Sequence, residues 1–158
     1  HLWPDFTKIP DADFLYMRYE ALLPEQAVVL NGRKIIPLPA NHTVPAVGYQ
    51  LDSGHASLVF TGDTTTHDAF WPIVNKISNL KYLIIESAFC NEKRAIAIRS
   101  KHLCPSLLME ELEKLEGEAE ILISHLKPGE ADITMNEIRQ CLARFHPRRL
   151  ENNQSLEF

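Results

Sequence analysis

The hydrophobic pattern of this chain changes part-way along, and that change limits the folds it can adopt more than any other feature. Residues 27–38 contain two apolar runs joined by Asn31-Gly32, a dipeptide that favours a two-residue β-hairpin turn. The runs 47–52 and 56–61, joined by Ser53-Gly54-His55, predict a second hairpin. The first half is therefore expected to be mostly β-structure, after an irregular opening of about two dozen residues that prolines keep from being helical.

From residue 67 onward, apolar residues recur with helical spacing and alternate with short runs typical of buried strands. Three helices are predicted: one that starts at residue 67, one from Pro105 to about Gly117, and one over 133–145. Strands are predicted over 82–85 and 121–123, and the tail 152–158 is predicted to be an edge strand. Two hairpins followed by alternating helices and strands predict an α/β fold with a mixed sheet.

The composition is that of one soluble globular domain, with 45% hydrophobic and 23% charged residues in 158. No apolar run approaches the ~18 to 20 residues of a membrane-spanning helix, so no membrane contact is expected. The formal charge of −5 argues against a broad basic surface for nucleic acid. Three cysteines without a Cys-x-x-Cys pair indicate neither a disulfide framework nor a thiolate zinc site, and favour a reducing, cytoplasmic location.

Three side chains that can bind metal follow predicted strands or lie in loops beside them, where α/β proteins hold ligands. These are His42, Asp63 and His125. Two imidazoles and one carboxylate form a ligand set that suits zinc, manganese or iron. The alternatives are that Asp63 caps the helix after residue 67 and that both histidines are structural. His67, four residues after Asp63, is a candidate extra ligand or supporting partner.

A second pair suggests acid–base chemistry. Glu86 closes the apolar run 83–85, and His102 lies just before the helix that Pro105 opens. A carboxylate at the end of a buried strand needs a partner. If Glu86 orients His102, the imidazolium can protonate an oxygen leaving group, which is the general-acid half of a hydrolysis. The alternative is a structural ion pair, or a surface histidine at a helix start.

In their order along the chain, five segments resemble the second half of the metallo-β-lactamase superfamily. They are His42-Thr43-Val44-Pro45-Ala46-Val47-Gly48-Tyr49, Thr61-Gly62-Asp63-Thr64, Leu83-Ile84-Ile85-Glu86-Ser87-Ala88-Phe89, His102-Leu103-Cys104-Pro105 and Ile123-Ser124-His125-Leu126-Lys127-Pro128. The chain resembles the phosphodiesterase branch, which holds the ribonuclease Z-like enzymes and the class II 3′,5′-cyclic-nucleotide phosphodiesterases. The opening Trp3-Pro4-Asp5-Phe6 favours the cyclic-nucleotide group.

The resemblance implies a role for each matched residue. His42 would bind one metal ion, Asp63 would bridge two, and His125 would bind the other. Glu86 and His102 would form a proton-donating pair. The implied enzyme is a hydrolase with two divalent metal ions, zinc or alternatively manganese or iron, that cleaves a phosphodiester such as cyclic AMP. A ribonuclease Z-like endonuclease acting on RNA, a hydrolase of thioesters or lactones, and a non-catalytic module are the alternatives.

The family signature His-x-His-x-Asp-His is missing from all 158 residues, which contain no His-x-His. In the family this signature lies upstream of the segments quoted above, and the chain starts with His1 instead of Met. We therefore expect residues 1–158 to be a single domain that forms the C-terminal half of an αββα sandwich in a longer enzyme. A lone half would leave one apolar sheet face uncovered, so we also expect a homodimer or a rearrangement that covers it.

Overall fold

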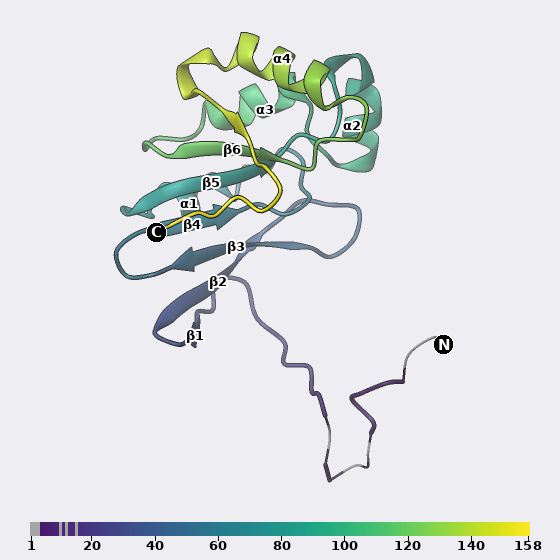
Figure 1. The fold of residues 1–158 in the computed structure, drawn as a ribbon, viewed down its shortest axis with the longest axis vertical. Helices are drawn as coiled ribbons and strands as arrows, with labels where there is room; N and C mark the ends of the chain where they lie inside the picture. The colour runs from purple at the N-terminus through teal and green to yellow at the C-terminus, as the bar shows by residue number, and fades with distance from the viewer. Residues whose placement is uncertain (1–3, 10, 12, 15) are drawn as a thin grey trace.

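A computed structural model describes residues 4–9, 11, 13, 14 and 16–158 of the chain. Within this part, the strands form one seven-stranded sheet in which spatial order follows chain order (Figure 1). Strands β1 to β4 pair in antiparallel fashion, and strands β4 to β7 pair in parallel. The predicted mixed α/β sheet is confirmed. Trp3 of the quoted opening segment lies outside the described residues.

Both predicted hairpins are present. Strands β1 (Val28–Leu30) and β2 (Arg33–Pro39) are joined by Asn31 and Gly32, whose φ angles of 50° and 77° fit a two-residue hairpin turn. Strands β3 (Val47–Asp52) and β4 (Ser57–Phe60) form the second hairpin. The described residues before β1 contain no helix or strand, as their prolines predict.

The second half alternates helices with parallel strands. Its elements are α1 (Trp71–Val74), β5 (Leu80–Glu86), α2 (Arg94–Ser100), α3 (Pro105–Leu112), β6 (Glu120–Ser124), α4 (Ala131–Cys141) and β7 (Arg148–Arg149), with 3-10 turns at Asn91–Lys93 and Ala143–Phe145. Helix α3 ends five residues before Gly117, so that glycine is not its cap. The segment predicted as an edge strand, 152–158, is not a strand, because its apolar residues pack onto the sheet face and form no ladder.

The two faces of the sheet are buried differently. Alternate residues of β5, such as Leu83 and Ile85, join the large core beneath the helices, while Ile84 between them faces the other side. On that second face Ile84 packs near Leu156 and Phe158 of the C-terminal tail, which crosses the sheet in Figure 1. The chain thus has a layer of helices on one face and its own tail on the other. None of the helices in the described ranges is long and apolar enough to cross a membrane.

Three parallel strands end at the same edge of the sheet. Strand β4 ends at Phe60, β5 at Glu86 and β6 at Ser124, and the loops that follow carry the side chains predicted to do chemistry. Because parallel strands bring their carboxyl ends to one edge, residues far apart in the sequence meet there.

Candidate metal centre

Four of the five predicted site residues form one compact group of donors at this edge. One ligand atom from each of Asp63, Glu86, His102 and His125 lies within 4.8 Å of the others. The fifth, His42, lies beside them, with its ring centroid 4.9 Å from that of His102. The His102 ring is also 4.9 Å from the His125 ring, so the three imidazoles form a row. The structure therefore brings together all five residues, although their individual roles stay predictions.

Asp63 and His125 face each other across the ends of β4 and β6. The Asp63 Oδ1 and His125 Nδ1 atoms are 2.5 Å apart, and Asp63 is half-exposed. Asp63 does not cap a helix, because α1 begins only at Trp71 and its N-terminus has no side-chain cap. That alternative is wrong, and the carboxylate is available for a ligand.

Close backbone packing places the Asp63 loop. A Cβ atom at Gly48 in β3 would lie 2.6 Å from the carbonyl oxygen of Phe60 and 2.8 Å from that of Thr61. Gly62 then turns the chain with a φ of 63°, in the left-handed region that glycine tolerates. The loop before Asp63 therefore lies directly against β3 because position 48 has no side chain.

Glu86 is fully buried and makes three hydrogen bonds. Its carboxylate accepts from the Thr64 N–H at 2.8 Å, the Leu103 N–H at 3.1 Å and the Nδ1–H of His102 at 2.7 Å. Burial raises the pKa of Glu86 from 4.5 to about 7, against the two backbone hydrogen bonds, which lower it. This arrangement fixes the His102 ring and leaves its Nε2 atom facing away from Glu86.

Burial also lowers the pKa of His102, and the charges of His42 and Lys127 add to that effect, whereas Asp63 opposes it. The pKa shifts of Glu86 and His102 have the same cause, because burial disfavours the charged form of each group. A buried carboxylate next to a buried imidazole is an arrangement that can hold one proton between them.

Two lysines that sequence reasoning missed complete the surroundings. The Lys127 Nζ atom lies 2.9 Å from His125 Nε2 and 5.7 Å from the centroid of the Phe89 ring. The Lys101 carbonyl lies 3.0 Å from His42 Nδ1. Lys127 falls inside a segment quoted for the resemblance, two residues after His125, whereas no local pattern marks Lys101.

No family model matches the sequence, and no curated protein matches it either. Solved structures do match. YhfI from Bacillus subtilis, described as a metallo-β-lactamase fold protein, aligns over 83% of this chain and 51% of its own, with a TM-score of 0.65 and 22% identity. The chain has the metallo-β-lactamase fold.

Two further solved structures are similar to this chain over most of its length. A diphosphatase of the PhnP family aligns over 86% of this chain and 47% of its own, with a TM-score of 0.61 and 20% identity. The short form of human tRNase Z aligns over 66% of this chain and 40% of its own, with a TM-score of 0.52 and 14% identity. The chain spans about half the length of these structures.

The donor group at the edge of this metallo-β-lactamase fold consists of residue types that bind divalent cations. In a tetrahedral site, nitrogen and oxygen ligands bound at about 2.0–2.2 Å lie about 3.3–3.6 Å from one another. The four donors are spread over up to 4.8 Å, so the side chains must draw closer together to bind one ion. His42 lies next to this group, on the side of His102, and adds a third imidazole.

His67, considered above as a further ligand, lies outside the donor group. Its backbone N–H donates to Glu111, and the same carboxylate oxygen accepts from the Trp71 indole at 2.7 Å. Although His67 is only four residues after Asp63, the chain has turned towards α1 by that point. His67 therefore belongs to a separate polar cluster beneath the helices.

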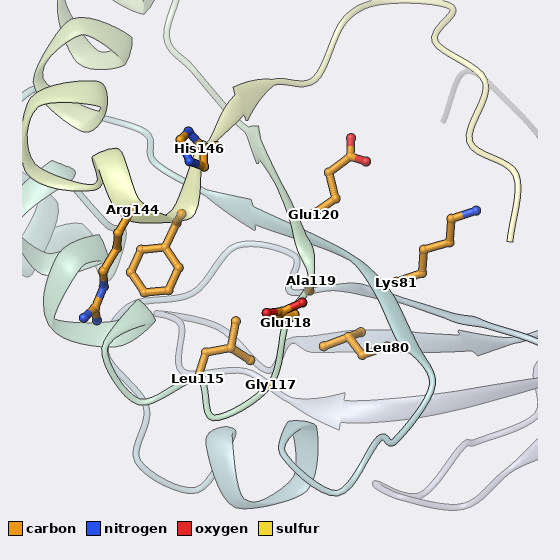
Figure 2. A pocket seen from close by; sticks show the side chains of 10 residues that line it. Leu80, Lys81, Leu115, Gly117, Glu118, Ala119, Glu120, Arg144 and His146 are labelled. Carbon is orange, nitrogen blue, oxygen red and sulfur yellow. The ribbon is translucent and has the colours of Figure 1, made fainter.

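A cavity of about 630 Å³ lies at the other end of the metallo-β-lactamase fold (Figure 2). It is lined by Leu80 and Lys81 at the start of β5, by Ala119 and Glu120 at the start of β6, and by Arg144 among others. These are the amino ends of the parallel strands, whereas the donor group lies at their carboxyl ends. The cavity is therefore separate from the candidate metal centre.

Proposed function

We propose that this chain is part of a metal-dependent phosphodiester hydrolase, with a 3′,5′-cyclic nucleotide such as cyclic AMP as its substrate. The observation that carries the proposal is the meeting of His42, Asp63, His102 and His125, with Glu86 behind them, at the carboxyl edge of a metallo-β-lactamase fold. Convergent imidazoles and carboxylates at such an edge are suited to metal-assisted hydrolysis.

In this proposal His42, Asp63 and His125 hold the metal. Bound there, a divalent cation would lower the pKa of a water molecule and stabilise charge on the phosphate. As an imidazolium, His102 donates its Nε2 proton to the leaving oxygen while its Nδ1–H stays on the Glu86 carboxylate, and the ring is left as a neutral imidazole. Because Glu86 is buried, its hydrogen bond to Nδ1–H is shielded from water and holds the His102 ring in place.

The charge of the chain supports a small substrate over a long nucleic acid. With a formal charge of −5, the surface offers little general attraction for RNA, so phosphate binding depends on local positive groups such as Lys127 and the metal. The named activities of the matched diphosphatase and tRNase Z support phosphate-ester chemistry. A ribonuclease Z-like endonuclease is the second candidate.

The proposal extends to the whole protein. Residues 1–158 would form the C-terminal half of the sandwich, with further metal ligands, among them those of a His-x-His-x-Asp-His motif, supplied by another segment. Two zinc ions, a homodimer and a cytoplasmic location belong to the same proposal.

The test compares the full-length protein and two variants on cyclic AMP, a tRNA precursor and bis(p-nitrophenyl) phosphate, with metal content measured in parallel. Asp63→Ala should lose bound metal and activity together. His102→Gln should retain metal and lose activity most with the poorer leaving groups. His55→Gln, at an exposed hairpin turn, is the matched control. Full activity and metal in Asp63→Ala would refute the metal assignment, and cleavage of only the tRNA precursor would replace the cyclic-nucleotide substrate.

A further inference from the structure

Lys101 joins the two segments that carry His42 and His102. It follows α2 directly and has a φ of 54°, in the left-handed region that residues with a Cβ atom rarely adopt. Glycine is the usual residue at such a helix end. A lysine in this conformation needs contacts elsewhere that keep it there.

The backbone carbonyl of Lys101 makes the first such contact. It lies 3.0 Å from His42 Nδ1, and a carbonyl only accepts, so the ring nitrogen carries the hydrogen. In a neutral imidazole the other nitrogen then has the free lone pair. The contact therefore selects the tautomer in which His42 Nε2 can coordinate a metal ion.

The ammonium group of the same residue makes two more contacts. Its Nζ atom donates to Asn41 Oδ1 at 3.0 Å and to the carbonyl of His42 at 3.2 Å. Asn41 is in turn hydrogen-bonded to the Asp63 loop, through Thr64 at 3.0 Å and Thr66 at 3.0 Å. Lys101 is therefore bonded to both the ring and the backbone of His42, and indirectly to the loop of Asp63.

We propose that Lys101 is the positioning residue for His42: its carbonyl sets the imidazole tautomer, and its ammonium group holds the side chain of Asn41 and the backbone of His42 in place. The consequence for metal binding rests on the proposed function, because it takes His42 Nε2 as a ligand atom. Contacts of this kind, one step removed from the metal, typically change metal affinity by about 10–100-fold when they are lost.

A purely structural role would give a different result on substitution. If Lys101 only ends α2, then Lys101→Gly should serve as well or better, because glycine accepts the left-handed conformation and keeps the carbonyl. Lys101→Met removes the ammonium group and keeps most of the side-chain stem. Lys76→Met makes the same chemical change at an exposed position and is the matched control.

The experiment measures two quantities on the full-length protein. One is the tautomer of the His42 ring in the metal-free protein at about pH 8, where histidine is neutral, from the nitrogen chemical shifts of the ring. The other is zinc affinity by titration. The wild type and Lys76→Met should show Nδ1–H at His42. Lys101→Met and Lys101→Gly keep the carbonyl but lose the ammonium contacts that hold His42 against it. In both variants that tautomer should therefore no longer predominate, and zinc affinity should fall about 10–100-fold.

Wild-type behaviour of both quantities in Lys101→Gly would overturn the proposal, because the ammonium contacts would then be dispensable. An unchanged His42 tautomer in Lys101→Met would overturn it as well. A wild type that binds no zinc would refute the proposed function. The positioning role would still be supported if the His42 tautomer changed in both Lys101 variants, so the two failures can be told apart.

Discussion

Replacing Gly48 by alanine should destabilise the protein and weaken its metal site together. A methyl group at position 48 would lie 2.6 and 2.8 Å from two backbone carbonyl oxygens, whereas ordinary contact begins at 3.4 Å. The methyl group is thus about 0.6–0.8 Å too close, and neither oxygen belongs to a side chain that can rotate away. Strands β3 and β4 must separate at the point where β4 leads into the Asp63 loop.

Forced overpacking of this kind typically costs about 1–3 kcal/mol. We expect about 2 kcal/mol for Gly48→Ala, which corresponds to about 4–8 °C in Tm for a domain of this size. Gly117→Ala is the matched control, since no atom lies within 4 Å of its added Cβ and its φ is not positive, so its effect should stay within about 0.5 kcal/mol. The loss of stability in Gly62→Ala should lie between those of Gly48→Ala and Gly117→Ala, because Gly62 has a φ of 63° and its added Cβ would lie 3.1 Å from the Val47 carbonyl oxygen.

Urea unfolding measures the free energy, and zinc titration reports the position of Asp63 relative to His125. Gly48→Ala should lower zinc affinity about 10–100-fold because it displaces a ligand-bearing loop. Equal stability of Gly48→Ala and Gly117→Ala would refute the steric argument. A destabilised Gly48→Ala with unchanged zinc affinity would instead show that the strand contact does not control the site.

Three other measurements test separate parts of the structure. Burial raises the pKa of Glu86 from 4.5 to about 7, so the stability that its protonated form contributes below pH 4.5 is lost as the pH rises through 7. In urea unfolding of the metal-free protein, the free energy of unfolding of the wild type should fall by about 3 kcal/mol relative to that of Glu86→Gln over this pH range. Parallel pH profiles of the two proteins would contradict this. Glu111→Ala should lower the free energy of unfolding by about 3 kcal/mol, because it leaves the buried Trp71 indole N–H without its acceptor. The same substitution at the exposed Glu110 should change stability little. Equal effects of the two substitutions would show that the Glu111 hydrogen bonds do not stabilise the fold. Zinc at 100 times its Kd should raise the free energy of unfolding by about 2.7 kcal/mol, and a chelator should reverse this. Asp63→Ala should abolish the stabilisation by zinc. If zinc still stabilised that variant, the metal would bind elsewhere.

Local chemistry explains which elements could be predicted. The hairpin at Asn31-Gly32 follows from two residues that tolerate positive φ, so its position was set by adjacent residues alone. Helix α2 was missed because only Ala97 in it is buried, while Ile96 and Ile98 are about half-exposed and give no apolar stripe. Strand β7 has only two residues and exists through its pairing with β6, which is a non-local interaction.

The same distinction applies to the site. Glu86 and His102 could be paired from sequence because a carboxylate that ends an apolar strand needs a partner, and their 2.7 Å contact agrees with that reasoning. The contacts of Lys101 and Lys127 with the site could not be predicted from the sequence, because only the fold creates them. Lys101 is 59 residues away from His42, and nothing near it in the sequence suggests a shared loop.

The spacing of the site residues follows from the topology of the sheet. Asp63, Glu86 and His125 each lie at or just after the end of one of three successive parallel strands. A parallel neighbour can be reached only by a crossover of a dozen or more residues, so such ligands cannot form a short local motif. Changing the length of the α1 segment should therefore leave the meeting of Asp63 and Glu86 intact as long as β4 and β5 stay paired. A one-residue slip between β4 and β5 would instead turn Glu86 to the opposite face of the sheet and remove the support of His102.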